Sequence, residues 1–362
     1  MGIRALNKFL QAKCKSSIKS IPLSELSGKK IAVDISIYLY KYISENALLE
    51  NLYLMISIFR TNNIIPIFIF DGKPPAEKNE TIASRKKNKT DAREEYYRLK
   101  LLVESMKTGT DADTDADTDA ELDEQKQKQK QYEINDMSQA MEQLKKKFIS
   151  IKYDDIQNVK TLLQAYGVTY FEAPGEADIL CAKLVTNNLV YACLSEDTDM
   201  FVYGCGRVLR YLSLTLSNVV IYDLNHILKT LNINMDVFKK ICILYGCDYC
   251  HESCVENNMC CETHEMLHNM NIFHAFQLFK KYCDSVMGTD GANAPEFYEW
   301  IVNEKIHSVK HIDEINKNIK LFDIDETKNL ELYDNIKILN GPINKKLLID
   351  IMKKENFIFI EK

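Results

Sequence analysis

The sequence of 362 residues lacks the marks of membrane and secreted proteins. No apolar run reaches the roughly 18 residues that a membrane-spanning helix needs. The opening segment MGIRALNKFLQAKCKSS has neither the apolar stretch nor the small-residue cleavage site of a secretory signal. The eleven cysteines are odd in number, which favours reduced thiols over a disulfide framework. We therefore expect an intracellular protein with no membrane partner.

Charge is distributed unevenly along the chain. The net charge is −6, but residues 111–124 (DADTDADTDAELDE) hold eight acids and no base, so the remainder carries +2. Between Arg85 and Lys100, seven bases stand against three acids. A local basic surface that contacts phosphates is therefore compatible with the acidic total. The acidic repeat is too polar to bury a core, and we expect it to be disordered.

Short apolar runs predict an α/β fold with a central, mostly parallel sheet flanked by helices. Such runs are typical of strands that are buried on both faces, and helix-period segments separate them. They lie at 31–33, 64–70, 168–171 and 190–194. Between about 76 and 150 the sequence is polar and nearly free of glycine and proline, which predicts two charged helices. After about residue 225 it predicts mostly helix.

Acidic residues follow the predicted strands or open the helices beside them. The carboxyl ends of parallel strands meet at one edge of a sheet, where binding sites form. Two of the acids share one helix start, where a regular helix would set their side chains about 200° apart, so one of them is expected to act from an irregular first turn. The candidates are Asp34, Asp71, Glu176, Asp178, Asp197, Asp199 and Asp248.

Seven carboxylates cannot crowd together as bare anions, because like charges would keep several of them protonated. Divalent cations such as Mg²⁺ or Mn²⁺ remove that penalty and prefer oxygen ligands. Two such ions can activate a water molecule and stabilise the leaving oxygen of a phosphodiester. Any one of these acids alone would be explained as a helix cap or a solvated strand end, but their recurrence at strand and helix ends favours a metal site.

Six segments resemble the flap endonuclease family of XPG-type 5′ nucleases. They are MGIRAL, VDISIYLY, FIFDGKPP, YFEAPGEADILCAKL, VYACLSEDTDMFVYG and ILYGCDYC, in family order over about residues 1–250. The resemblance implies a PIN-like 5′ nuclease fold with an inserted helical arch and a helical C-terminal part. It also implies hydrolysis of DNA at 5′ flaps or branches during replication, repair or recombination, with endonuclease and 5′–3′ exonuclease activity. The seven acids would then hold two Mg²⁺ or Mn²⁺ ions.

The resemblance assigns roles to four further residues. Gly2 would lie near the scissile phosphate, and Tyr40 would stack on a base near the cut. Lys78 and Arg85 would hold the scissile phosphate and stabilise developing charge. Considered without the resemblance, Tyr40 is a core tyrosine at helical spacing, and the two bases belong to a solvated helix face.

The resemblance also divides the chain into four regions. We expect an N-terminal nuclease region over 1–105, an arch insert over 76–150 with its acidic tip at 111–124, and an internal nuclease region over 151–250. Residues 251–362 would form a helical C-terminal region with a degenerate helix–two-turn–helix, because the glycine-rich turn of the family is missing there. No sliding-clamp motif is present, and a monomer that binds branched or 5′-flap DNA is expected.

The stretch after Gly246 is rich in soft metal ligands. Cys247 and Cys250 have zinc-ligand spacing, and Cys260 and His264 complete four candidate ligands for a structural zinc ion. The alternative is ordinary reduced thiols. Two other functions stay open at this point: a ribonuclease of the same fold that cuts single-stranded RNA, and a non-catalytic nucleic-acid-binding scaffold.

Overall fold

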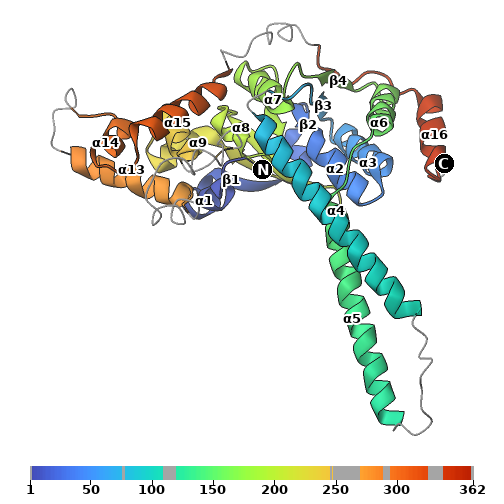
Figure 1. Cartoon of the computed structure of the whole chain (residues 1–362). Coiled ribbons are helices and arrows are strands. Elements are labelled where there is room, and N and C mark those ends of the chain that lie inside the picture. Colours follow the sequence, from blue (N-terminus) through green and yellow to red (C-terminus); the bar gives the residue numbers. More distant parts are fainter. Residues whose placement is uncertain are drawn as a thin grey trace.

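A seven-stranded mixed sheet forms the centre of the protein (Figure 1). The computed structural model describes residues 2–75, 78–108, 120–244, 247, 270–287, 294–324 and 337–359. The strand order is β1-β7-β6-β5-β2-β3-β4. The strands are β1 (Ile18–Pro22), β2 (Lys30–Asp34), β3 (Ile65–Phe70), β4 (Thr169–Glu172), β5 (Ala192–Leu194), β6 (Arg207–Ser213) and β7 (Asn218–Asp223).

The five strands from β6 to β4 are parallel, and the antiparallel β7 and β1 extend the sheet at one side. The predicted α/β fold with a mostly parallel sheet is therefore confirmed. The four apolar runs correspond to strands β2, β3, β4 and β5. Strand β1 escaped prediction because it is an edge strand whose residues are half-buried or exposed, so it carries no apolar run.

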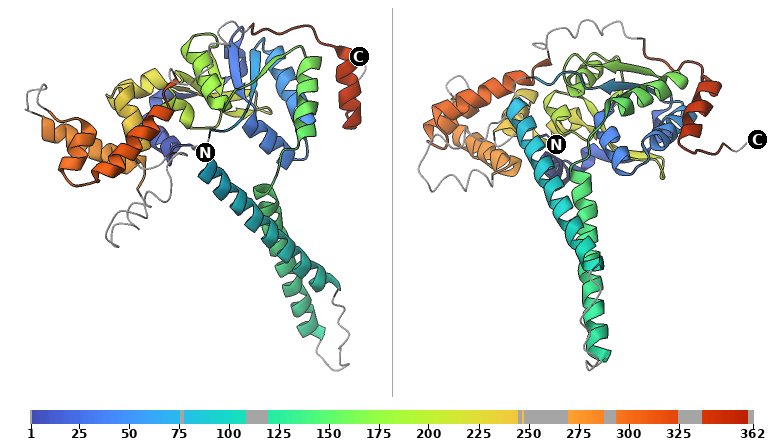
Figure 2. Two further views of the ribbon diagram at one scale, coloured as in Figure 1. Left: turned by 45° about the horizontal axis from the view of Figure 1, so that its top comes forward. Right: turned by 45° about the vertical axis from the view of Figure 1, so that its right-hand side comes forward.

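Helices cover both faces of the sheet (Figure 2). Alternate residues of β3 enter opposite cores: Ile67 and Ile69 face one, Phe68 and Phe70 the other. The first core is closed by α1 (Leu6–Lys13), α7 (Ala177–Thr186), α8 (Asp199–Val202), α9 (Leu224–Leu231), α10 (Met235–Ile243), α13 (Ile272–Val286), α14 (Phe297–Asn303) and α15 (Val309–Leu321). The second is closed by α2 (Ser36–Ser44), α3 (Leu48–Thr61), α6 (Tyr153–Ala165) and α16 (Lys345–Lys354).

Two long helices, α4 (Asn79–Thr108) and α5 (Ala120–Lys147), project from the body as an arch (Figure 1). Ala92, Val103 and Ile134 are buried within it, whereas most other described side chains of the arch are exposed or half-buried. The two charged helices expected there are present. The acidic repeat DADTDADTDA was expected to be disordered; its residues 111–119 lie outside the described residues, and α5 begins at its last residue, Ala120. Acidic residues favour a helix N-terminus because they face the positive end of its dipole.

The chain returns from the C-terminal helices to the second core. Leu348, Ile351 and Met352 of α16 pack there beside α6. Within the described parts of the chain, no helix combines the length and the apolar character that crossing a membrane requires. The described cysteines, including Cys247, are free thiols. The boundaries of the four predicted regions stay predictions.

Candidate functional site

The carboxyl ends of β2, β3 and β5 meet at one edge of the sheet. The chain leaves β2 towards β3 and β4 on one side and comes back to β5 on the other, so the strand order reverses between β2 and β5. Such a switch point is where open α/β sheets bind their ligands. Asp34 is the last residue of β2, and Ser195 directly follows β5. The Ser195 hydroxyl donates a hydrogen bond to Oδ2 of Asp34 (3.0 Å), which joins the two strand ends.

The loop after β5 holds two further acids in place through its own backbone. The N–H of Asp197 donates to Oγ of Ser195 (3.1 Å), and the N–H of Asp199 donates to Oδ1 of Asp197 (3.0 Å). Asp197 and Asp199 are only 7% and 1% exposed. The Asp197 carboxylate is therefore held by the backbone of its own loop, and both acids are buried at the same edge as Asp34.

Asp71, Glu176 and Asp178 complete the group of described acids. Asp71 follows β3 and accepts hydrogen bonds from Oγ of Ser36 and from the N–H of Ala177 (2.8 Å). Glu176 is the N-cap residue of α7 and has extended backbone angles, whereas Asp178 lies in the first helical turn. Glu176 is thus outside the regular helix, and the two neighbouring acids are not forced onto opposite sides of it.

Burial and neighbouring acids raise the pKa values of Asp34 and Asp178. Burial, followed by the negative charge of Asp71, raises the pKa of Asp34 from 3.8 to about 7, although hydrogen bonds from Ser195 and Ser36 oppose the shift. Burial and the charges of Asp34, Asp197, Asp199 and Asp71, in that order, hold the pKa of Asp178 well above its ordinary value. This edge of the sheet concentrates negative charge that its hydrogen bonds do not neutralise.

A divalent cation fits this chemistry. Oδ1 of Asp178 is buried and accepts no hydrogen bond from the described residues. Carboxylate oxygens are the ligands that Mg²⁺ and Mn²⁺ prefer. Among the residues that the structure describes, however, no three Asp, Glu, His or Cys side chains are yet close enough to share one ion. Asp71 is bonded to Ser36 and Ala177, and Glu176 to Lys78, so these two carboxylates have protein partners in this arrangement.

Some predicted ligands lie outside the described residues. Asp248 is one of them, and so are three of the four candidate zinc ligands, Cys250, Cys260 and His264. Cys247 is described and is 9% exposed. The zinc site and the role of Asp248 stay predictions.

Gly2 lies against the acids of the β5 loop. Its φ is +79°, and a Cβ added to it would lie 2.2 Å from Oδ1 of Asp197 and 2.7 Å from Oδ1 of Asp199. Only glycine fits this position without displacing the carboxylates. The N-terminal end of the chain also lies near the start of α4 in each view (Figure 2).

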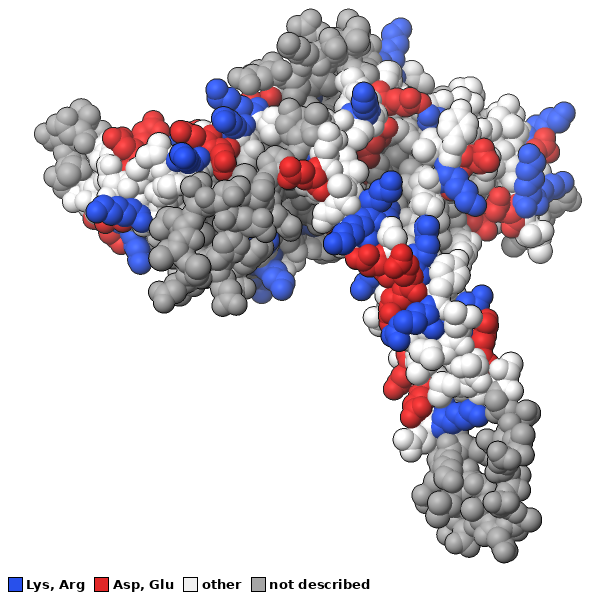
Figure 3. All heavy atoms as spheres, viewed as in Figure 1, with Lys and Arg blue, Asp and Glu red and all other residues white. Residues whose placement is uncertain are grey.

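The two predicted phosphate-binding bases have different surroundings. Lys78 directly precedes α4 and is 7% exposed, and its Nζ donates to Oε1 of Glu176 at 2.7 Å. Arg85 is exposed on α4. Figure 3 shows basic side chains where the arch joins the body, with acidic ones interspersed along its length. Lys78 therefore links the base of the arch to a candidate metal ligand, whereas Arg85 is accessible to a ligand.

Tyr40 is 44% exposed and is not a core residue. The Nζ of Lys89, on α4, lies 4.9 Å from the centre of its ring and also donates to the carbonyl of Ile149 (3.1 Å). Lys89 therefore joins α2 to α4 and to the segment that follows α5. Lys89 and the hydroxyls of Ser36 and Ser195 escaped prediction from sequence, although each serine lies within two residues of a predicted acid.

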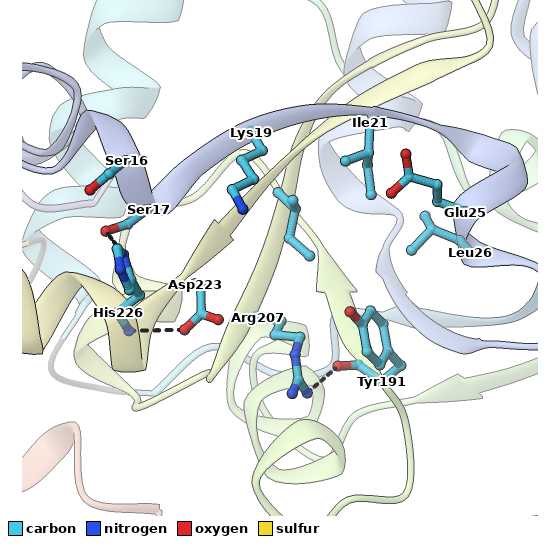
Figure 4. A pocket seen from close by; sticks show the side chains of 11 residues that line it. Ser16, Ser17, Lys19, Ile21, Glu25, Leu26, Tyr191, Arg207, Asp223 and His226 are labelled. Carbon is cyan, nitrogen blue, oxygen red and sulfur yellow. Dashed lines mark hydrogen bonds between the residues drawn. The ribbon is translucent and has the colours of Figure 1, made fainter.

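A cavity of about 300 Å³ lies at the opposite end of the parallel strands (Figure 4). Tyr191, Arg207 and Asp223 are among its lining residues, and it contains none of the predicted site residues. The acidic edge is therefore separate from this cavity.

Comparisons with known proteins agree with this arrangement. The model of the XPG N-terminal domain matches residues 1–92, and that of the XPG I-region matches residues 167–248. Flap endonuclease 1 of Glossina morsitans morsitans is 30% identical over 268 residues, which are 69% of this chain and 62% of that protein. The probable RAD2-like endonuclease 369L of Invertebrate iridescent virus 6 is 29% identical over 279 residues, 69% of this chain and 67% of that protein. The chain thus spans a little under two thirds of the length of the Glossina protein.

Solved structures share the fold over nearly the whole chain. The catalytic core of Rad2 in complex with DNA substrate superposes with a TM-score of 0.61 at 20% identity, covering 98% of this chain and 95% of that one. Flap endonuclease-1 from Methanococcus jannaschii gives a TM-score of 0.53 at 18% identity, covering 93% and 90%. Both XPG family models match the chain, its strand-end acids gather at one sheet edge, and the fold agrees with that of these nucleases. The chain therefore belongs to the XPG-type flap endonuclease family.

Proposed function

We propose that this protein is a metal-dependent, structure-specific 5′ nuclease that hydrolyses DNA phosphodiesters at 5′ flaps or branches, in replication, repair or recombination. The observation that carries the proposal is the gathering of six described carboxylates at the switch point of the sheet, with the pKa of Asp34 and Asp178 raised by burial and by their acidic neighbours. The similarity to proteins named flap endonuclease 1 and RAD2-like endonuclease supports it.

The acids would hold two Mg²⁺ or Mn²⁺ ions. When bound, such ions supply an activated water molecule and charge stabilisation for the departing oxygen. The ligands that we propose are Asp34, Asp71, Glu176, Asp178, Asp197 and Asp199, with Asp248 as the seventh.

Residues of the chain itself would position the phosphate. Gly2 leaves Asp197 and Asp199 undisturbed because it has no side chain. Arg85 offers an exposed guanidinium near the base of the arch, where it would stabilise the charge that develops on the scissile phosphate. Lys78 would hold the scissile phosphate together with Arg85, and its ion pair with Glu176 would orient that carboxylate. The other bases of α4 would neutralise further phosphates and make binding sensitive to salt.

Replacing Arg85 with alanine is expected to lower the cleavage rate about a hundredfold, because one charge-assisted donor aimed at a transition state is typically worth about 3 kcal/mol. Binding of the same DNA should change much less. Single-turnover rates and Kd values measured on one flap substrate separate the two effects. Arg98→Ala is the matched control, since Arg98 is an exposed arginine about 20 Å further along α4 that pairs with Glu95. A loss of affinity alone would make Arg85 a positioning residue.

Gly2→Ala is expected to slow cleavage by about 10- to 100-fold, because the added methyl group displaces Asp197 and Asp199 and small misplacements of reacting groups are costly. Gly28→Ala is its control. Gly28 also has a positive φ (+73°), but nothing lies within 4 Å of a Cβ added there. Both variants place alanine at a positive φ, but only Gly2→Ala brings the added methyl group against neighbouring side chains. Equal cleavage rates for the two variants would contradict the role of Gly2.

A panel of labelled substrates tests the proposed function as a whole. It contains 5′-flap DNA, the matching duplex, single-stranded DNA and single-stranded RNA, each with Mg²⁺ and with EDTA. We expect cleavage of the flap to dominate and EDTA to abolish it. Faster cleavage of the RNA would point to the ribonuclease alternative, and binding without cleavage to a scaffold.

A further inference from the structure

Tyr211 has a backbone conformation that is rare for an aromatic residue. Its φ is +56°, in the left-handed region. It lies in β6 where the pairing with β7 shifts register between Arg210 and Ser213. Such strain persists only where the surroundings impose it, and it concentrates at functional sites.

Two side chains from other elements hold Tyr211 in this conformation. Its N–H donates a hydrogen bond to Oε1 of Glu196, in the loop after β5. Its hydroxyl oxygen accepts from Nδ2 of Asn7, on α1, at 2.6 Å. Oδ1 of Asn7 in turn accepts from Nη1 of Arg210 (2.8 Å). The ring is therefore fixed from both ends.

A buried cation supports the ring. Arg210 is 5% exposed, and its guanidinium carbon lies 5.2 Å from the centre of the Tyr211 ring. Nη2 of Arg210 donates to the carbonyl of Glu196 at 2.7 Å. Tyr211 itself is 45% exposed. The protein thus presents an aromatic surface to solvent, supported from behind by a guanidinium that is paired with Glu196 (3.4 Å).

This surface lies at the same sheet edge as the acids. Strands β5 and β6 are parallel, with Leu194 opposite Leu209, so Tyr211 is level with Glu196, two residues further along. Glu196 stands between Ser195, which bonds to Asp34, and Asp197. One loop therefore carries two candidate metal ligands and also the acid that holds Tyr211.

We propose that Tyr211 is a stacking platform for an unpaired nucleobase of the branched substrate. The proposal rests on the nuclease function proposed above and narrows its substrate. A base inside a duplex has both faces covered by its neighbours, so only a base that is unstacked at a branch offers a free face to the ring. The guanidinium of Arg210, which is itself paired with Glu196 (3.4 Å), covers the ring from the protein side and leaves the exposed part of the ring for the base.

The test compares Tyr211→Gly with Tyr211→Phe. Glycine adopts a positive φ freely, so Tyr211→Gly relieves the backbone strain and removes only the ring. Tyr211→Phe keeps the ring and loses the bond to Asn7. The control is Tyr191→Ala. Tyr191 also has an arginine over its ring, with Arg207 at 4.6 Å, but lies at the opposite end of the parallel strands (Figure 4).

Binding of a 5′-flap DNA and of a fully paired duplex is measured by fluorescence anisotropy, with Ca²⁺ in place of Mg²⁺ to prevent cleavage. We expect Tyr211→Gly to weaken flap binding by about 5- to 150-fold, the range that base–aromatic stacking gives, and duplex binding by less than about twofold. Tyr211→Phe and Tyr191→Ala should stay within about threefold on both. A 2-aminopurine placed at the branch should be quenched by the wild type and by Tyr211→Phe, and not by Tyr211→Gly.

If Tyr211→Gly binds the flap as tightly as the wild type does, the inference is wrong and the strained conformation of Tyr211 has only a structural role. Equal losses on flap and duplex would also overturn it. If Tyr211→Gly melts at a lower temperature than the wild type, Tyr211→Asn, which also tolerates a positive φ, takes its place in the same comparison. Failure of the wild type to cleave any flap would instead contradict the proposed function, so the two failures are distinguishable.

Discussion

Asp199→Asn is expected to lower flap cleavage by about a thousandfold or more, because it removes a negative ligand from the acidic edge while conserving the size of the side chain. Asp199 is 1% exposed and begins α8, and its backbone bond to Asp197 does not depend on its own carboxylate. The variant should therefore fold normally. Single-turnover rates in Mg²⁺, with circular dichroism for the fold, check the prediction.

Asp223→Asn is the matched control for that variant. Asp223 caps α9 by accepting the N–H of His226 (3.0 Å), and it lies at the opposite end of the sheet from the acids. Asparagine caps helices as well as aspartate does, so stability should be nearly unchanged. Cleavage by Asp199→Asn within tenfold of the wild type would contradict the assignment of Asp199 as a metal ligand.

Asp34→Asn is expected to stabilise the metal-free protein at pH 8 although it disables cleavage. The folded protein holds the proton of Asp34 more tightly than the unfolded chain does, because the pKa of about 7 lies above the ordinary 3.8. The stability that this group contributes is therefore fully present below pH 3.8 and is lost as the pH rises through about 7. The loss corresponds to at most about 4 kcal/mol of unfolding free energy. Asparagine avoids this loss of stability because its side chain stays neutral at every pH.

Thermal denaturation in EDTA from pH 4 to pH 8 measures this effect. The melting temperature of Asp34→Asn should exceed that of the wild type at pH 8, and the difference should disappear towards pH 4. Adding Mg²⁺ at pH 8 should stabilise the wild type and leave the variant almost unchanged. A variant that is less stable than the wild type in EDTA at pH 8 would show that the hydrogen bonds of Asp34 outweigh its electrostatic cost.

The acidic edge could be predicted from sequence because each of its parts has a local signal. Continuous apolar runs marked β2, β3 and β5, and parallel strands bring the acids that follow them to one edge. Gly167 follows the C-cap of α6, and its φ of +64° is the left-handed conformation in which glycine commonly ends a helix.

Features that depend on contacts between distant segments could not be predicted in this way. The conformation of Tyr211 is imposed by Asn7 and Glu196, and no local pattern distinguishes this tyrosine from any other strand residue. The sequence does not distinguish Lys89 from the other bases of α4, because its contact with the Tyr40 ring appears only in the folded structure. The ion pair of Lys78 with Glu176 likewise joins residues that are 98 positions apart.

That ion pair gives the arch a mechanical connection to the acidic edge. Lys78 directly precedes α4, a helix of 30 residues that is about 45 Å long. The end of this helix that joins the body therefore lies beside Glu176. Asp34 and Asp71 are fastened by hydrogen bonds inside the body. The acids are therefore held by different parts of the molecule: the Glu176 carboxylate is bonded to the base of the arch, whereas Asp34 and Asp71 are bonded only within the body.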